Sequence, residues 1–534
     1  MRQSGGPSAS PAVEAPRDAM EERGASAAGG ARRAGGAAAI IVCHGMGQQV
    51  QFETLNAVAA ALWRKQSDEP MRPDAVRVRY VAFGDDWLPR VEMTVDAGGA
   101  TREVHLYEAY WAPITEGKVG LGDVFAFLLR AGARGLRYGM RGAFDRWMFG
   151  GLRPFGLPAR GTYALALALA SCAALALLYV AFAPLVLARA LALLYPALPS
   201  GTALRLLAAA AWWCASAVAL LAACGALGSW LAGLAGAPAG GRESAPRPGL
   251  GARLFAVTAA ALAALGALAA STAAARVLPA ALARLTSGLG PATSSGGALA
   301  LLAGGAIALA ALRRYLVQYV GDVAAYVSAH EVSRFQEMRR EIQAVGRRVA
   351  RNVYGAREGV GGALQYRDVI VVGHSLGSVI AYDMLDDSIN RDLLLASTGG
   401  GAARLHVAER TALLITCGSP LDKTAFLFRA QKDDLPVREA LAGAVQPMIV
   451  DYANRPARWI NLWSPWDWIS GSLEYYDASP VPAAHARRAV RNVRLAGGPR
   501  GPVRAHVQYW SRGELGEALF AALAGDRAGG PRGG

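Results

Sequence analysis

The sequence is poor in cysteine and in charged residues. Five cysteines are scattered over 534 residues, without the spacing of a zinc site or of a disulfide framework, at positions 43, 172, 214, 224 and 417. This pattern is typical of a reducing compartment and predicts no bound metal. Asp, Glu, Lys and Arg make up only 18% of the chain, against about 25% in ordinary soluble domains. So low a charged fraction argues against an entirely soluble protein.

The sequence also shows neither a nucleic-acid-binding signature nor the pattern of a secretory signal peptide. The net charge of +15 would suit a nucleic-acid-binding protein, but no zinc-finger, RNA-binding or helix-turn-helix signature is present. Because the arginines gather beside apolar segments instead, we predict no nucleic-acid partner. Residues 1–36 contain almost no large apolar residue and no apolar stretch of a secretory signal peptide. We expect this segment and residues 524–534 to be disordered tails.

Long uncharged apolar segments are what the sequence does contain. Hydrophobic residues make up 53% of the chain, and the mean hydropathy is +0.24. A membrane-spanning helix needs about 20 apolar residues. We therefore expect an all-α transmembrane insertion at 161–314 with spans near 163–185, 208–232, 254–275 and 294–312. The last two segments are mostly Ala and Gly, which leaves three or four spans open.

Arginines mark both ends of this insertion. Seven of them precede the first span and several follow the last, which by the positive-inside rule predicts that both flanks are cytoplasmic. The alanine-rich composition favours a bacterial inner membrane. Between 115 and 160 the arginines alternate with aromatic residues, so this connector is either an amphipathic segment on an anionic membrane surface or a basic loop.

The chemistry of the chain is indicated by Gly373-His374-Ser375-Leu376-Gly377. A short β-branched segment from Val369 to Val372 precedes it, and small or apolar residues from Ser378 to Leu385 suit a helix after it. A serine in such a strand–turn–helix is typical of a nucleophile, with its hydroxyl exposed at the helix N-terminus. The alternative is a glycine-rich turn with a capping serine.

A second glycine-rich turn lies near the N-terminus. His44-Gly45-Met46-Gly47 follows a predicted strand from Ala37 to Cys43 and precedes an amphipathic helix. A dinucleotide-binding loop would need a third glycine where Val50 stands, which argues against a nucleotide. We expect His44 to hydrogen-bond the loop rather than to act in catalysis.

The remaining pattern predicts an alternation of strands and helices. A single helix is expected from Asp322 to about Tyr354, and a closing helix from Gly513 to Leu523. Further strands are expected at 76–83, 91–95, 103–111, within 411–420 where the strand ends in a turn, at 458–467 and at 490–495.

A serine nucleophile needs an imidazole base and a carboxylate that orients the imidazole. His506 follows the last predicted strand, and Asp467 follows the strand before it. Asp422 follows an earlier strand and remains the alternative acid. The order Ser375, Asp467, His506 is that of one known fold family.

Taken together, these motifs resemble those of α/β-hydrolases of the lipase and esterase type. The resemblance implies an α/β fold with a mostly parallel sheet flanked by helices, built from residues 37–114 and 315–523 and interrupted by the transmembrane insertion. It further implies that the backbone N–H groups of Met46 and Leu376 form an oxyanion hole, and that no cofactor is needed. The supporting loop residues are His44, Gly45, Gly47, Gly373 and Gly377.

The expected function is therefore a membrane-embedded serine hydrolase that cleaves carboxylic esters. A lipid is the expected substrate, because a site tethered to the bilayer meets amphipathic molecules at high local concentration. An acyltransferase or thioesterase on the same fold, or a non-catalytic membrane scaffold, remains an alternative. No pattern in the sequence predicts the oligomeric state.

Overall fold

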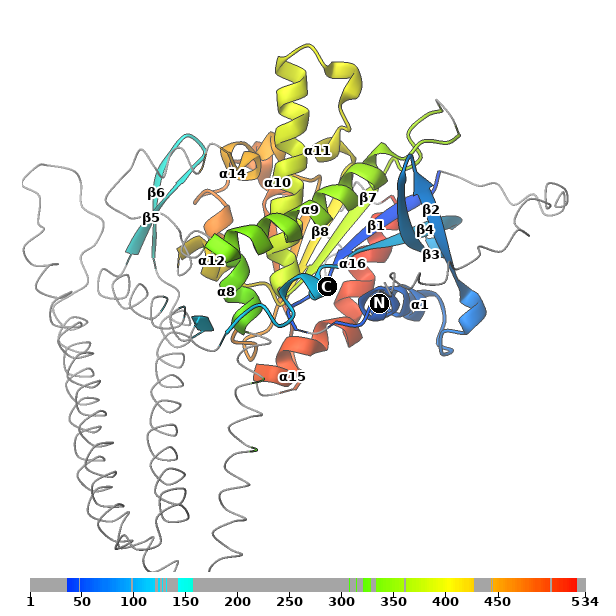
Figure 1. Ribbon diagram of the computed structural model, residues 1–534, viewed down its shortest axis with the longest axis horizontal. Helices are drawn as coiled ribbons and strands as arrows, with labels where there is room; N and C mark the ends of the chain where they lie inside the picture. The colour runs from blue at the N-terminus through cyan, green and yellow to red at the C-terminus, as the bar shows by residue number, and fades with distance from the viewer. Residues whose placement is uncertain are drawn as a thin grey trace, which may run out of the picture.

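The computed structural model (Figure 1) describes most of the chain outside the predicted insertion. The described ranges, apart from a few single residues elsewhere, are 36–120 without 48 and 98, 143–156, 320–327, 333–426 without 360 and 361, 445–499, and 502–525. The four predicted spans lie outside the described ranges. Among the helices of those ranges, none is both long and apolar enough to cross a bilayer.

A mixed, mostly parallel sheet forms the centre of the protein. Its strand order is β10-β9-β8-β7-β1-β4-β3-β2; β3 pairs antiparallel with both β4 and β2, and the other neighbouring strands pair in parallel. The strands are β1 (Ala38–Cys43), β2 (Val76–Phe83), β3 (Asp86–Ala97), β4 (Ala100–Ala109), β7 (Val369–His374), β8 (Thr411–Cys417), β9 (Trp459–Trp463) and β10 (Val490–Arg494). The predicted strands are confirmed, as is the α/β class.

The two central strands join the distant parts of the chain. β1 pairs with β4 on one side and with β7 on the other, so that Ile41 lies between Tyr107 and Val371. Every residue of β1 and β7 is buried. Parallel strands covered on both faces favour continuous apolar sequences, which is why both strands were recognisable.

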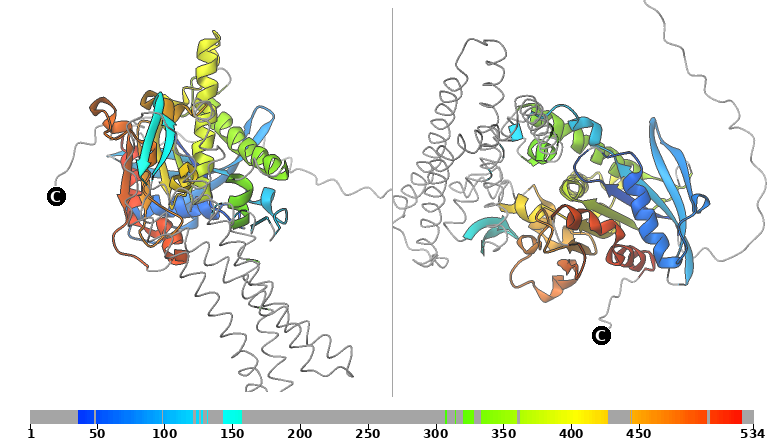
Figure 2. Two further views of the ribbon diagram at one scale, coloured as in Figure 1. Left: turned by 90° about the vertical axis from the view of Figure 1, so that its left-hand side faces the viewer. Right: turned by 90° about the horizontal axis from the view of Figure 1, so that it is seen from below.

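Helices cover both faces of this sheet (Figure 1 and Figure 2). Ile40 and Val42 point to the face covered by α1 (Glu53–Gln66) and α16 (Gly513–Leu523). Ile41 and Cys43 point to the opposite face, covered by α9 (Ser333–Gly355) and α10 (Leu376–Ser397). The alternation of side chains along a strand thus divides the core into two apolar layers.

The single helix predicted from Asp322 to Tyr354 is wrong. The chain forms α8 (Gly321–Val327) and then α9, and Figure 1 shows the two at an angle. Ala324 and Ala325 of α8 pack with Val119 in a small apolar cluster of their own. These contacts set the direction of α8, and they bring the chain before and after the predicted insertion together.

Part of the predicted basic connector is a β-hairpin, β5 (Ala143–Met148) and β6 (Gly151–Gly156). Phe144 and Met148 belong to the main apolar core. The guanidinium of Arg146 donates to the carbonyl oxygen of Tyr475 at 2.5 Å and lies 4.3 Å from the centre of the Tyr476 ring. This hairpin therefore packs on the protein through its buried side chains.

Candidate active site

Ser375 occupies a strained turn between β7 and α10. Its φ of 53° and ψ of −129° are rare for a residue with a side chain. A Cβ on Gly373 would lie 2.5 Å from Ser378 Cα, and one on Gly377 would lie 2.2 Å from the carbonyl oxygen of Cys43. The glycines of the motif are thus required by close backbone approaches, which hold the strained turn in place.

His506 connects Ser375 to an acid. It lies in α15 (Pro502–Val507), beyond the carboxyl end of β10. Its Nε2 is 2.9 Å from Ser375 Oγ, and its Nδ1 is 3.0 Å from Asp467 Oδ2. With the proton on Nδ1 donated to the carboxylate, Nε2 is free to accept the proton of the serine hydroxyl.

Asp467 is held in the loop after β9 by three donors. Oδ1 accepts the backbone N–H of Ile469 at 2.9 Å, and Oδ2 accepts the Tyr509 hydroxyl at 2.8 Å in addition to His506. Burial alone would raise the pKa of Asp467, but the hydrogen bonds from His506 and Tyr509 hold it below its ordinary value. The carboxylate therefore stays ionised beside the imidazole.

The alternative acid, Asp422, lies elsewhere. It is in α12 (Leu421–Phe426) after β8, and its Oδ2 accepts a 2.6 Å hydrogen bond from Lys423 Nζ. Burial raises the pKa of Asp422, against the effect of the lysine. Of the two candidates, Asp467 is the one that contacts His506.

The two predicted oxyanion donors belong to two segments that meet at the serine. Leu376 is the first residue of α10, and Met46 is in the loop after β1. A Cβ on Gly45 would lie 2.9 Å from His374 Nδ1 and 3.2 Å from Ser375 Cβ, so this loop passes directly over the serine. Within the described residues, neither the N–H of Met46 nor that of Leu376 donates to another protein group. Both donors are therefore available to a ligand.

His44 has the loop-bonding role that the sequence suggested. Its Nε2 accepts the backbone N–H of Trp111 at 3.0 Å, so its Nδ1 carries the proton and donates to the carbonyl oxygen of Gly45 at 2.8 Å. The Trp111 ring stacks on the imidazole at 4.8 Å. Burial lowers the pKa of His44 to about 4, which keeps the ring neutral.

His374 hydrogen-bonds the backbone of the base, His506. Its Nε2 lies 2.9 Å from the carbonyl oxygen of His506 and donates to it. Burial, assisted by the charge of His506, lowers the pKa of His374 to about 3. A neutral imidazole thus bridges the serine turn and the segment that carries His506.

The expectation of an exposed serine hydroxyl is wrong. Ser375 is only 1% exposed, while the side chain of His506 is 12% exposed. The reason is the loop of Gly45 and Met46, which covers the serine. Three large apolar residues that are next in sequence to the acid or the base are each about half exposed: Trp466, Trp468 and Val507.

Three residues of this arrangement were not predicted from the sequence: Tyr509, Trp111 and Asp322. Each acts through a contact with a residue at least 42 positions away, and no local motif signals such a contact. In the described part of the chain, no group of three or more His, Cys, Asp or Glu residues has the arrangement of a metal site.

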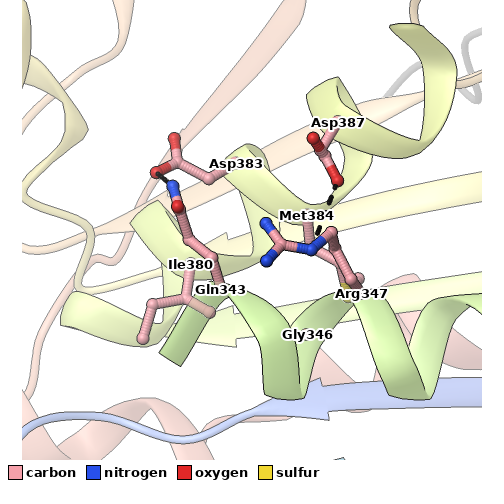
Figure 3. A pocket seen from close by; sticks show the side chains of 7 residues that line it. All are labelled: Gln343, Gly346, Arg347, Ile380, Asp383, Met384 and Asp387. Atoms are coloured by element: carbon pink, nitrogen blue, oxygen red, sulfur yellow. Dashed lines mark hydrogen bonds and ion pairs between the residues drawn. The ribbon is translucent and has the colours of Figure 1, made fainter. Parts of the chain in front are cut away.

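A small pocket between α9 and α10 is separate from this site (Figure 3). Arg347 pairs with Asp387 at 3.9 Å, and Gln343 Nε2 donates to Asp383 Oδ2 at 3.5 Å. These contacts join the two helices across the pocket. The pocket is a polar junction in the helical layer.

No protein-family model matches the chain, and neither a curated protein nor a solved structure matches it. The structure by itself defines an α/β protein whose largely parallel sheet carries hydrogen-bonded serine, histidine and aspartate side chains at the carboxyl ends of its strands.

Proposed function

We propose that the protein is a membrane-embedded serine hydrolase that cleaves carboxylic esters, with an α/β-hydrolase-like fold. The observation that carries this proposal is the continuous hydrogen-bonded chain from Ser375 Oγ through His506 to Asp467. A serine hydroxyl is a weak nucleophile near neutral pH and needs such a base.

The first half of the reaction forms an acyl-enzyme. Ser375 Oγ attacks the ester carbonyl carbon while its proton passes to His506 Nε2, and Asp467 stabilises the resulting imidazolium. The negative charge that develops on the carbonyl oxygen is bound by the N–H groups of Met46 and Leu376. Collapse of the tetrahedral intermediate breaks the ester C–O bond, and His506 returns the proton to the leaving alcohol.

Water completes the cycle. His506 removes a proton from a water molecule, which attacks the acyl carbon, and the second tetrahedral intermediate releases the acid and restores Ser375 Oγ–H.

A lipid substrate is supported by the surroundings of the site. Trp466, Trp468 and Val507 expose apolar surface next to Asp467 and His506. Trp111, before the predicted insertion, and Asp322 in α8, after it, both hydrogen-bond residues of the loop next to Ser375. Because both ends of the predicted insertion belong to one folded unit, the insertion must cross the bilayer an even number of times.

Labelling with a fluorophosphonate tests the proposal. The full chain in membranes should be labelled, and mass spectrometry should locate the adduct on Ser375. Ser375→Ala should abolish labelling, whereas Ser388→Ala, a serine of α10 that bonds the carbonyl oxygen of Met384, should retain it. A folded wild-type protein without labelling would favour a non-catalytic scaffold and reject the proposal.

Product analysis separates hydrolysis from the related reactions on such a scaffold. Simple hydrolysis should release free acid at the same rate with or without an added alcohol. An acyltransferase would instead form a new ester, and a thioesterase would prefer thioester substrates. Either result would keep Ser375 as the nucleophile. The first would change the acyl acceptor from water to an alcohol, and the second would change the bond that is cleaved.

A further inference from the structure

The loop that carries Met46 is bound by a residue from beyond the predicted insertion. Asp322, in α8, accepts the backbone N–H of Gly47 through Oδ2 at 2.7 Å. Its side chain is buried, and Thr115, which lies before the insertion, is next to the carboxylate. Burial of a carboxylate is costly unless hydrogen bonds compensate for the lost water, and the Gly47 N–H is one of the groups that supply them here.

The position of this bond bears directly on the oxyanion donor. His44 Nδ1–H holds the carbonyl oxygen of Gly45, and thereby the plane of the Gly45–Met46 peptide. Asp322 holds the N–H of Gly47, and thereby the plane of the Met46–Gly47 peptide. Because peptides are planar and trans, fixing the Gly45 oxygen directs the Met46 N–H to the opposite side.

We propose that Asp322 is a positioning residue for the oxyanion hole: it anchors the Met46–Gly47 peptide from α8 and so holds Met46 in place, while the bond from His44 directs the Met46 N–H. This inference rests on the proposed hydrolase function. Asp322 touches no reacting atom and acts only through the loop.

The same contact ties the catalytic loop to the ends of the insertion. A Cβ on Gly321 would lie 3.1 Å from Val119, so the chain on either side of the insertion is closely packed. The loop is held on one side by Trp111 and His44 and on the other by Asp322. A shift of α8 relative to the sheet would therefore move the loop that carries the Met46 N–H. The hydrogen bond between Ser375 and His506 includes no residue of α8 and would be less affected.

The rival explanation is that Asp322 only fastens α8 to the fold. Kinetics and binding of a transition-state mimic separate the two. Steady-state kcat and KM for a soluble ester, and the inhibition constant of an alkyl boronic acid, would be measured on the full-length protein in detergent. The boronate becomes tetrahedral on Ser375 Oγ and places an oxygen where the oxyanion forms, so it reports on the donors.

Asp322→Ala removes the acceptor of the Gly47 N–H. We expect kcat to fall by about 10- to 100-fold, somewhat less than loss of an oxyanion donor itself, with KM within about twofold because ground-state binding does not use the donor. The boronic acid should bind more weakly by the same factor as the loss in kcat. Asp322→Asn keeps an oxygen acceptor and should remain within about threefold of the wild type.

The matched control is Asp392→Ala in the distal half of α10. Asp392 is also a buried carboxylate that accepts backbone N–H groups, from Leu405 and Val407 at 2.7 Å each. This variant should lose stability yet keep kcat and boronate affinity. Should Asp322→Ala not fold, Asp322→Leu keeps the volume without the acceptor and should show the same kinetic loss.

The outcomes are distinguishable. Normal kcat and boronate affinity in a folded Asp322→Ala or Asp322→Leu protein would overturn the positioning role and leave the hydrolase function intact. Equal loss in the Asp392→Ala control would also overturn it, because the effect would then follow stability. A wild-type protein that neither labels with fluorophosphonate nor binds the boronic acid would overturn both proposals together.

Discussion

The Tyr509 hydroxyl donates to Asp467 Oδ2, the same oxygen that accepts the His506 Nδ1–H. Tyr509 is buried in the 3-10 turn after α15, three residues past the base. Its oxygen also accepts the backbone N–H of Ser464 at 3.1 Å. Burial raises the pKa of Tyr509 above its ordinary value, so the phenol remains a neutral donor and orients the carboxylate.

Removal of this hydroxyl should weaken catalysis without removing any member of the triad. For Tyr509→Phe we expect kcat to fall roughly tenfold, which corresponds to about 1.4 kcal/mol of transition-state stabilisation. The free energy of unfolding should fall by about 2 kcal/mol, because the Ser464 N–H loses its acceptor. Tyr452→Phe, which removes a buried hydroxyl bonded to the Ala478 N–H, is the control and should leave kcat unchanged. An unchanged kcat in Tyr509→Phe would contradict the orienting role.

The acid can be identified by exchanging each candidate for its amide. Asp467→Asn should lower kcat by about 10⁴-fold, because the amide stabilises the wrong imidazole tautomer. Asp422→Asn should change kcat by less than about threefold, since Asp422 bonds Lys423 and not His506. Steady-state kinetics on a soluble ester measure both. The reverse ranking of the two variants would assign the acid to Asp422.

Gly377 should tolerate no side chain. In Gly377→Ala the new Cβ would lie 2.2 Å from the carbonyl oxygens of Cys43 and His44, so β1 and the start of α10 would have to separate. We expect little folded protein, measured as the yield of a single species after detergent extraction. Gly401→Ala places its Cβ in open space and should be recovered like the wild type. Normal yield and kcat in Gly377→Ala would show that this approach is not required.

Glu108 should make stability depend on pH. It is buried at the end of β4, where Oε2 accepts the Phe52 N–H at 2.9 Å, and burial raises its pKa from 4.5 to about 7. A raised pKa means that the folded state binds the proton more tightly. The resulting stabilisation is complete below pH 4.5 and is lost as the pH rises through 7.

Glu108→Gln should remove this pH dependence. Relative to the wild type, the variant should gain up to roughly 3 kcal/mol of unfolding free energy between pH 4.5 and pH 8, at about 1.4 kcal/mol for each pKa unit. Denaturant unfolding at the two pH values measures the difference. Glu69→Gln, an exposed glutamate in the segment after α1, should show no such gain. A difference between wild type and Glu108→Gln that does not change with pH would contradict the prediction.

The parts of the fold and site that were predictable are those encoded locally. β1 and β7 are short, fully buried β-branched segments, and the spacing around Ser375 is a local requirement of its turn. The choice between Asp467 and Asp422 was open because both follow neighbouring parallel strands. Which of them reaches His506 depends on the shape of two loops, and sequence spacing does not determine that shape.

The unpredicted features depend on contacts between distant residues. Asp322 meets Gly47 across 275 positions, and the packing of α8 on Val119 overrides the helical periodicity that suggested one long helix. The burial of Ser375 follows from a loop over 300 residues earlier in the chain. Such effects come from tertiary packing, which local propensity does not encode.

The position of β1 between β4 and β7 has a consequence for biosynthesis. More than 300 residues separate Cys43 from Val369, so a ribosome adding 5–20 residues per second needs roughly 15–65 s to deliver the missing neighbour. During that interval one edge of a wholly apolar strand remains unpaired, which is the condition under which nascent chains aggregate. Translation of this protein must therefore shield that edge until the second half of the sheet emerges.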